Sequence, residues 1–492
     1  MKSGKINRRQ FAKTVAASAA FAAFAPNILS AAEAKKPKPY NPHKVDAENN
    51  PYAKNPMNIA FVGTGLMGGQ NMRITLDQLK QRCVAVCDVD LDYGRKNQRK
   101  YAPDAPLFMD YREMFAKMAG KIDGVVVSTP DNSHFAIAME ALKHKIPVFV
   151  EKPLCYSIEQ VRLLTQAAAK AGVPTQMGNF VHSACGIDYV REYVDAGVIG
   201  EVKEVIAWTC RPLVDVNQPP KGWKVWPKPE PIPPTLDWDK WLNTTEYNDY
   251  YSAIVPLNWR RFFKFGSGSL GDIGCHILDV PITAFGLPAP SRVKSRQRGG
   301  TSLCVPLQDC VEYYFDTSKF GKPMKISWFS GVLKPNAQGN FPAGYDKSFL
   351  PPLPKEFTDM RRDYRHLSAD GMFIVGTEGV LYSPVMHLMG KPVVLPKSRA
   401  AVAKSLDKRT AGFANKNHLL NFLEGIAGDV KMCNSDFSVS GPLSEIIQLG
   451  NVTLQTGRDI VWDSKNLKCV GDPEADKFVS PKMRPEYMPK GI

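Results

Sequence analysis

The sequence predicts an α/β protein whose N-terminal domain is a doubly wound parallel sheet. An apolar run, Ile59 to Val62, is followed by three glycines at the G-x-G-x-x-G spacing, beginning at Gly63, and then by a segment that can be helical. A second apolar run ends in Asp88, 20 positions after the third glycine, Gly68. Strand-like and helix-like segments then alternate as far as Val150, as in a parallel sheet with crossover helices.

Each glycine of this motif has a separate physical role. Gly63 permits the tight turn, Gly65 lets the backbone approach a pyrophosphate, and Gly68 lets helix and strand pack closely. With Leu66 and Met67 they form the expected phosphate-binding turn, because a helix N-terminus offers unpaired N–H groups and a partial positive charge.

Asp88 occupies the position at which an acidic residue binds the adenosine ribose 2′-hydroxyl. A carboxylate there would repel a 2′-phosphate, so the sequence favours NAD over NADP as cofactor. Arg95 and Lys96 lie close enough in sequence to weaken that preference, and NADP stays possible.

Length and composition indicate a folded protein of two large domains. The chain has 492 residues, too many for one ordinary core, with 44% hydrophobic and 23% charged residues. The net charge is +15, but no basic block is interleaved with aromatic residues, so nucleic-acid binding is not expected. The ten cysteines form no C-x-x-C pair and have no histidines at zinc spacing; we expect buried thiols and no metal site.

Residues 1–34 are typical of an export signal. The stretch 7–13 resembles a twin-arginine motif, an apolar stretch follows, and Ala32-Glu33-Ala34 offers a cleavage site. We expect export to the periplasm by the twin-arginine translocase and no membrane span in the mature protein; an uncleaved membrane anchor is the alternative. Residues 35–56, rich in Pro, Lys and Asn, predict an extended arm or, alternatively, a disordered linker.

Two motifs follow strands of the predicted sheet, where ligands bind in such folds. Residues 129–134, Thr-Pro-Asp-Asn-Ser-His, are expected to cap a helix over 135–144, and the strand 147–150 ends at Glu-Lys-Pro. The candidate cofactor ligands in these turns are Thr129, Pro130, Asn132, His134, Glu151 and Lys152.

With Gln176-Met177-Gly178-Asn179 and Leu270-Gly271-Asp272-Ile273-Gly274-Cys275-His276, these motifs occur in an order that resembles the Gfo/Idh/MocA family (glucose-fructose oxidoreductase and inositol dehydrogenase), in its exported bacterial branch. The resemblance implies an NAD(P)-binding domain over 57–178. It also implies a substrate and oligomerisation domain over 179–470 with a large, mostly antiparallel open sheet, followed by a tail over 471–492. A homo-oligomer, dimer or tetramer, is implied as well.

The resemblance carries the family's catalytic group over to Lys152, Asp272 and His276, and the residues support it independently. Asp272 and His276 are four positions apart and share a face if 273–285 is helical. A histidine suits removal of a hydroxyl proton near neutral pH, and a lysine can stabilise the developing alkoxide. The alternative for Lys152 is a salt bridge with Glu151.

The second domain should contribute substrate contacts from Asn179, Trp259 and Arg260, and Asn179 is a candidate cofactor ligand as well. We expect a helix over 187–196 and strands over 202–209, 311–315, 324–329 and 371–381, and the resemblance implies a closing helix over 441–456. A Pro- and Trp-rich surface loop spans 211–241. In it, Trp223 and Trp226 are either sugar-stacking platforms or a clamp on their own domain, while Trp238 and Trp241 are expected to anchor the core.

The function expected from these observations is oxidation or interconversion of hydroxyl groups of a sugar or polyol, with a tightly bound NAD that is recycled within the catalytic cycle. An NAD-dependent glycosidase, acting by transient oxidation and elimination, is the first alternative. A non-catalytic sugar-binding protein is the second.

Overall fold

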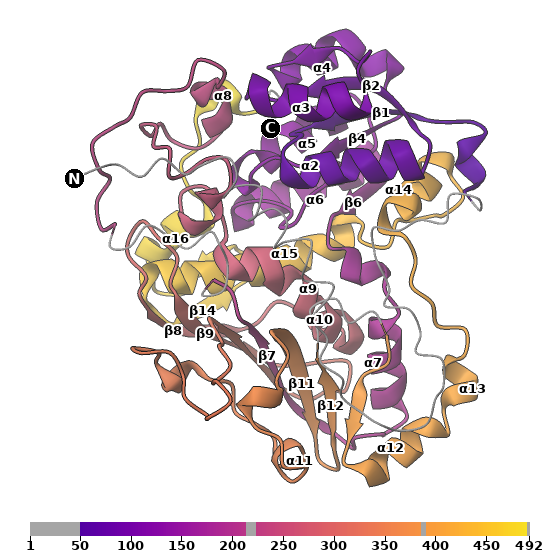
Figure 1. Ribbon diagram of the computed structural model, residues 1–492, viewed down its shortest axis with the longest axis vertical. Coiled ribbons are helices and arrows are strands. Elements are labelled where there is room, and N and C mark those ends of the chain that lie inside the picture. The colour runs from indigo at the N-terminus through magenta and orange to yellow at the C-terminus, as the bar shows by residue number, and fades with distance from the viewer. Residues whose placement is uncertain (1–49, 213–222, 385–389, 490–492) are drawn as a thin grey trace. The chain divides into compact units, whose positions relative to one another are not determined.

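The computed structural model describes residues 50–212, 223–384 and 390–489 (Figure 1). The expected export signal and residues 35–49 of the expected arm lie outside the described residues. The described end of that arm packs near α14 (His418–Ala427), where the Tyr52 hydroxyl bonds to Asp429 and Asn50 donates to the Leu79 carbonyl. In the described ranges, no helix has both the length and the apolar character needed to cross a membrane.

The N-terminal domain is a six-stranded, wholly parallel sheet, as the sequence predicts. Its central strands are almost fully buried, which explains their continuous apolar runs. In spatial order the strands are β3 (Leu107–Phe108), β2 (Arg82–Cys87), β1 (Asn58–Val62), β4 (Gly124–Val127), β5 (Val148–Val150) and β6 (Thr175–Met177). The chain changes direction across the sheet between β1 and β4, and ligands bind at the carboxyl ends of strands at such a point.

Helices connect successive strands of this sheet, and the helix after β4 begins earlier than expected. It starts at Asp131 rather than residue 135, because Pro130, with its fixed φ of −62°, directly precedes the first turn and an acidic residue there favours the helix dipole. The helices are α2 (Leu66–Met72), continued by a π-helical stretch (Arg73–Gln78), α3 (Leu91–Tyr101), α4 (Tyr111–Met118), α5 (Asp131–Lys143) and α6 (Ile158–Ala171).

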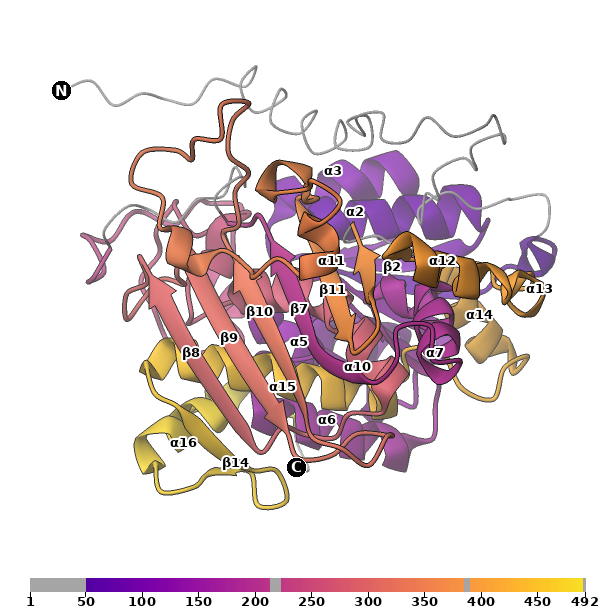
Figure 2. The ribbon, with the colours of Figure 1, turned by 90° about the horizontal axis from the view of Figure 1, so that it is seen from below.

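Within the described residues, the second domain has a nine-stranded sheet in which only the β7–β10 pair is parallel (Figure 2). In spatial order the strands are β13 (Val393–Leu395), β12 (Val380–Ser383), β11 (Asp370–Gly376), β7 (Val202–Thr209), β10 (Met324–Ser330), β9 (Gln308–Phe315), β8 (Arg292–Arg298), β14 (Ile460–Asp463) and β15 (Lys468–Cys469). The expected large, mostly antiparallel sheet is confirmed.

One expected strand of this sheet, 371–381, is wrong in detail, because it is a hairpin of β11 and β12. The Gly376 N–H donates to the Gly379 carbonyl at 2.8 Å and closes the turn, which the Glu378 N–H ties to Ile199. The sequence Gly376-Thr377-Glu378-Gly379 is a turn signal, and it interrupts the apolar run.

Helix α15 (Phe437–Thr456) joins the two domains, because it packs against α6 of the first and β8 of the second. Figure 2 shows it crossing one face of the β8–β10 strands. At Gly450 a Cβ would lie 2.2 Å from the Tyr313 hydroxyl, so the helix approaches the sheet as closely as backbone allows. The other helices are α7 (Gly186–Asp195), α8 (Trp238–Leu242), α9 (Cys275–Ile277), α10 (Asp279–Phe285), α11 (Lys355–Thr358), α12 (Lys397–Lys404), α13 (Asp407–Thr410) and α16 (Pro473–Val479).

A buried carboxyl lies inside the second sheet. Asp309 of β9 pairs across the strands with Ser330 of β10, whose hydroxyl donates to Asp309 Oδ2. The Asp309 side chain is buried, and burial raises its pKa to about 7, against the opposing effect of the Ser330 hydrogen bond. Between about pH 4 and 7 the folded chain therefore binds a proton here that the unfolded chain releases.

We predict that Asp309 makes the protein less stable as the pH rises. Because the folded-state pKa is raised, its contribution is fully present below about pH 4 and lost as the pH rises through 7. Asp309→Asn should remove this dependence, so that the wild type loses about 2 kcal/mol relative to the variant between pH 5 and 8. Urea unfolding at both pH values measures it, with exposed Asp316→Asn as control; parallel pH profiles would contradict the prediction.

Candidate functional site

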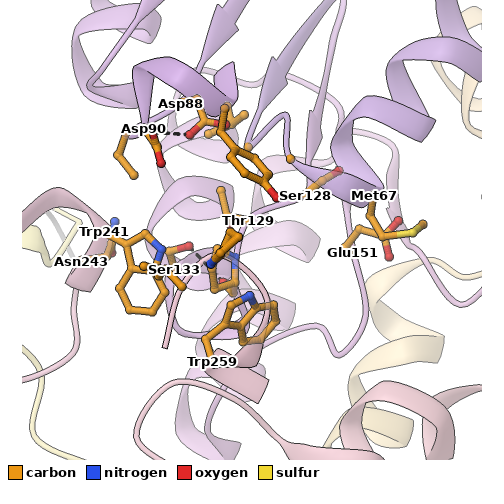
Figure 3. Close-up of a pocket in the computed structure, with 18 of the residues that line it drawn as sticks. Met67, Asp88, Asp90, Ser128, Thr129, Ser133, Glu151, Trp241, Asn243 and Trp259 are labelled. Carbon is orange, nitrogen blue, oxygen red and sulfur yellow. Dashed lines mark hydrogen bonds between the residues drawn. The ribbon is translucent and has the colours of Figure 1, made fainter. Parts of the chain in front are cut away.

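A pocket opens at the carboxyl ends of the parallel strands, where the sheet changes direction (Figure 3). Of the residues that the sequence singled out, the pocket is lined by Gly63, Gly65, Leu66, Met67, Asp88, Thr129, Pro130, Glu151, Lys152, Trp259 and Arg260. The first nine come from the parallel-sheet domain and the last two from the second domain, so both domains form the site. We call this pocket the cofactor groove.

The glycine turn packs too closely against its neighbours to admit side chains at Gly63 and Gly68. Gly63 has φ +77°, and a Cβ on it would lie 2.7 Å from the Thr129 side chain. A Cβ on Gly68 would lie 1.9 Å from the Gly63 carbonyl oxygen, and one on Gly65 would lie 3.2 Å from the ring of Tyr93. Any side chain at Gly63 or Gly68 would therefore displace the turn from the strand ends.

Asp88 lies at one end of the groove, held by backbone donors. Its Oδ2 accepts from the Thr64 N–H at 2.9 Å and its Oδ1 from the Asp90 N–H at 3.0 Å. Burial raises the pKa of the Asp88 carboxyl, and these donors oppose the rise. Gly94 of α3 is required beside it, because a Cβ there would lie 2.6 Å from the Asp88 Cβ. Asp90 also lines the groove, so two carboxylates share this end (Figure 3).

Gly68, Asn132 and His134, which the sequence proposed as cofactor ligands, lie behind the groove wall. The His134 ring nitrogens lie 2.9 Å from the carbonyl oxygens of Thr129 and Pro153, so this buried side chain ties two groove turns together. The Asn132 amide donates to the Leu242 carbonyl at 3.0 Å. The structure gives these side chains positioning contacts with the loops.

Glu151 is buried and bonded within its own domain. Its Oε1 accepts from Asn71 Nδ2 at 3.0 Å, and Asn71 also donates to Ser128 at 3.0 Å. A Cβ on Gly178 would lie 2.8 Å from Glu151 Oε2, which explains the glycine in the Gln-Met-Gly-Asn motif. The ammonium of Lys152 bonds instead to Asp272 of the second domain, to its carbonyl at 3.0 Å and to its carboxylate.

Asp272 is held by three cations. Besides Lys152, Arg211 donates to its Oδ2 at 2.7 Å, and Arg260 Nε lies 3.5 Å from its Oδ1. Burial alone would raise the pKa of Asp272, but the charges of Lys152, Arg260 and Arg211 outweigh burial and hold the pKa well below its usual range. The carboxylate is therefore ionised throughout the neutral range and keeps Lys152 in place.

His276 lies on α9, buried at 3% exposure, with its ring 4.7 Å from that of Phe180. The expected continuous helix over 273–285 is divided: a π-helical turn (Leu270–Gly274) precedes α9, and α10 follows after Leu278. Pro281 explains the second break, because it has no N–H to continue the hydrogen-bond ladder. Asp272 lies in the π-helical turn, and His276 follows it in α9.

Asn179 is fully buried, lies outside the groove lining, and hydrogen-bonds to another residue of the second domain. Its amide donates to Asp279 Oδ2 at 2.9 Å, and the same carboxylate lies 2.9 Å from His182 Nδ1. Burial lowers the pKa of His182, but the Asp279 charge raises it more, so the net shift is upward. This cluster fixes α10, and with it the segment that carries His276.

Sequence reasoning missed several groove residues. Asp131 lines the groove, accepts from the Ser267 N–H at 3.0 Å, and has its pKa raised to about 6 by burial, against the charge of Arg260. The second domain also contributes Leu236, Lys240, Trp241, Asn243, Val255, Pro256 and Leu257. The tryptophan-rich stretch 211–241 contains only Leu236, Lys240 and Trp241 of these residues. No local pattern marked the others, because their place depends on tertiary packing.

The four tryptophans of that stretch belong to one aromatic cluster. Trp238 and Trp241 are buried, as expected, and Trp241 also lines the groove. Trp223 and Trp226 pack against Tyr251 and are half-buried. Of the two alternatives for this pair, these contacts favour the clamp on their own domain over the sugar-stacking platform.

The expected burial of the ten thiols is confirmed, with nine buried and Cys83 half-buried. In the part of the chain that the structure describes, no group of three or more His, Cys, Asp or Glu side chains is arranged to hold a metal ion.

Two family models match this chain: the oxidoreductase family's NAD-binding Rossmann fold over residues 57–179, and its C-terminal alpha/beta domain over residues 214–287. An inositol 2-dehydrogenase of Burkholderia multivorans is 30% identical over 146 residues, 29% of this chain and 43% of the relative. A 2,7-anhydro-N-acetylneuraminate hydratase of Mediterraneibacter gnavus is 28% identical over 165 residues, 34% of this chain and 42% of the relative. The matches span less than half of each curated relative.

Solved structures of similar fold cover most of the chain. The WlbA dehydrogenase of Bordetella pertussis, in complex with NADH and UDP-GlcNAcA, has a TM-score of 0.55 at 12% identity, covering 83% of this chain and 99% of that one. An inositol dehydrogenase homolog of Azotobacter vinelandii, complexed with NADH and myo-inositol, has a TM-score of 0.50 at 16% identity, covering 83% and 98%. With the glycine cradle and Asp88 in place, residues 57–179 form an NAD-binding Rossmann domain, and the model that matches them is that of the Gfo/Idh/MocA oxidoreductase family.

Proposed function

We propose that this chain is an NAD-dependent oxidoreductase that acts on a carbon bearing a hydroxyl group in a sugar or polyol. The observation that carries the proposal is the position of Lys152. It lines the cofactor groove, and its ammonium bonds to Asp272 of the second domain, so a charged cluster directly adjoins the groove. The curated relatives support this substrate class, because they include inositol 2-dehydrogenases.

In this proposal each polar residue has one task. Oxidation of an alcohol removes a proton from oxygen and a hydride from carbon, and bound NAD supplies the hydride acceptor. The ammonium of Lys152 stabilises the negative charge that develops on the oxygen. His276 takes the hydroxyl proton, and Asp272 positions Lys152. Because Asp272 stays ionised, it holds the lysine over a wide pH range.

Besides His276, which takes the hydroxyl proton, the residues proposed to contact substrate are Lys152, Arg260 and Trp259. The Arg260 guanidinium lies 4.1 Å from the Trp259 ring centroid and faces Asp272, so it presents donors beside the charged cluster. Asn179 and Asp272 act through neighbours, Asn179 by fixing Asp279 and Asp272 by fixing Lys152.

We predict that Lys152→Met lowers kcat by about 100-fold to 1,000-fold, because it removes the charge that stabilises the oxyanion but keeps the apolar stem. NAD affinity should change less than threefold. Steady-state kinetics with the sugar identified below, together with NAD titration by protein fluorescence, measure both. Lys143→Met, on the exposed side of α5, is the control. An unchanged kcat would remove Lys152 from the proposed mechanism.

Two carboxylates at the ribose end of the groove explain a preference for NAD. Asp88 and Asp90 both line this end, and a 2′-phosphate brought between them would meet two negative charges. Arg95 and Lys96, the sequence argument for NADP, are exposed residues of α3 outside the groove lining.

We predict that Asp88→Ser shifts the ratio of NADP to NAD affinity toward NADP by at least about tenfold, an amount equal to 1.4 kcal/mol. The reason is loss of both the ribose ligand and the repulsion. Fluorescence titration of each nucleotide measures the ratio. Asp92→Ser, an exposed acid in the first turn of α3, should leave it unchanged. Equal ratios in wild type and Asp88→Ser would refute the role of Asp88.

The proposed function is tested by mixing the purified protein, without added cofactor, with a panel of free sugars, polyols and glycosides. A rise in reduced-nicotinamide absorbance no larger than the enzyme concentration is expected, because the cofactor is retained. No absorbance change with any compound, even with added NAD, would count against the oxidoreductase and in favour of a sugar-binding protein.

A second candidate function is glycoside cleavage by transient oxidation and elimination. The specific support is that curated relatives include 2,7-anhydro-N-acetylneuraminate hydratases, whose name denotes addition or removal of water from a sugar. Analysis of the products from the same samples separates the candidates, since cleavage releases a free aglycone without net reduction of NAD.

We also propose export to the periplasm by the twin-arginine translocase, which residues 1–34 alone support. A homo-oligomer is proposed as well. Twin-arginine export carries folded proteins, which suits an enzyme loaded with NAD before export. A fusion of residues 1–34 to a reporter, with Arg8 and Arg9 both changed to Lys as control, tests the export. Light scattering of the purified protein tests the oligomer.

A further inference from the structure

The Asp88 end of the cofactor groove is closed by the second domain. Leu236, Lys240, Trp241 and Asn243 line the groove there, opposite the Rossmann residues. In Figure 3 Trp241 and Asn243 lie on the side of Asp90, away from Met67 and Glu151. We call residues 235–245, which include α8, the adenosine flap.

The adenosine flap is hydrogen-bonded to the Rossmann domain along its length. The Leu91 N–H donates to the Thr235 carbonyl and the Asp237 N–H to the Val89 carbonyl, both at 2.9 Å, around an antiparallel bridge between Asp90 and Leu236. At its other end Thr244 Oγ1 donates to the Asn132 carbonyl at 3.2 Å. The flap is thus joined to the loop that carries Asp88 and to the start of α5.

The chemistry of this end suits a planar aromatic base. Trp241 stacks on Trp238, with ring centroids 4.6 Å apart, and thereby keeps a fixed orientation in the groove wall. Tyr93 and Tyr111 line the same end, and Asn243 hydrogen-bonds to Tyr111. Aromatic side chains offer stacking faces for a base. Asn243 is buried and its Oδ1 accepts from the Thr244 N–H at 2.8 Å, so it holds Tyr111 and the flap backbone in place beside those faces. The ribose ligand Asp88 adjoins them.

The C-terminal tail fastens the flap from outside. Arg484 donates from Nη2 to the Asp239 carbonyl at 2.7 Å and from Nε to the Asn243 carbonyl at 2.8 Å, with its backbone N–H on the Thr244 carbonyl. The Tyr487 hydroxyl donates to the Asp239 carboxylate. Figure 1 shows the yellow C-terminal segment running from α16 to α8.

The same tail is anchored on the Rossmann domain. The Arg112 guanidinium of α4 lies 4.6 Å from the Tyr487 ring centroid, and Arg112 Nη1 donates to the Glu486 carbonyl at 3.2 Å. Arg484 is only 11% exposed in its side chain, so these contacts are built into the fold. The tail therefore links α4 and α8, which lie at the two sides of the adenosine end.

We propose that the adenosine flap is the adenine subsite of this chain, and that residues 483–487 control NAD release by holding the flap against the Rossmann domain. The inference rests on the proposed retention of NAD and gives its structural cause. NAD leaves only when the flap moves, and the flap moves only when the Arg484 and Tyr487 contacts open.

The test uses the full chain and two probes of the cofactor's halves, AMP and nicotinamide mononucleotide. Arg484→Ala and Tyr487→Phe should weaken AMP binding and speed NAD dissociation at least tenfold for the first variant and about threefold for the second. Nicotinamide mononucleotide affinity should be unchanged. Arg458→Ala, which breaks the exposed Arg458–Asp472 ion pair at 2.6 Å near the start of the tail, is the matched control.

Wild-type AMP affinity and NAD dissociation in both variants would overturn the proposal. So would an equal loss of AMP and nicotinamide mononucleotide binding, because that indicates general destabilisation. These readouts need no turnover, so they are independent of the sugar panel: tail-dependent AMP binding with no sugar oxidation would leave the adenine subsite standing and reject the proposed oxidoreductase.

Discussion

The site depends on one half-buried carboxylate, Asp272, and the three cations around it. An ionised carboxylate taken out of water is costly unless it is paired and hydrogen-bonded. Here the second domain supplies Arg211 and Arg260, but the third partner, Lys152, comes from the Rossmann domain. The pairing therefore sets how far apart the domains lie at this point. It also delivers the lysine ammonium to the inner end of the cofactor groove.

Other contacts between the domains enforce the same arrangement. Helix α15 packs on α6 and on β8, and its closest approach to the sheet is possible only because Gly450 has no side chain. At the opposite end of the groove the adenosine flap and the tail add backbone hydrogen bonds and the Arg112–Tyr487 contact. Residues of both domains therefore line the groove.

Several polar residues of the motifs act by positioning. His134, Asn132 and Asn179 are buried and hydrogen-bond to other protein groups. His134 bonds to the groove turns, Asn132 to the adenosine flap and Asn179 to Asp279. Buried polar groups are nearly always satisfied in this way, and a satisfied side chain fixes the segments it joins. The motifs found in the sequence therefore include residues that position the groove as well as residues that line it.

The sequence by itself determined the features that depend on neighbours along the chain. The bounds of β7, the glycine turn and the position of Asp88 follow from local periodicity, from the absence of a Cβ and from spacing. It also identified Lys152 and Asp272, although not their ion pair. Only the tertiary structure decided that Trp241 forms a groove wall and that Arg484 fastens it. The physical reason is that these contacts join residues more than a hundred positions apart, and no local pattern encodes which distant backbone a side chain will meet.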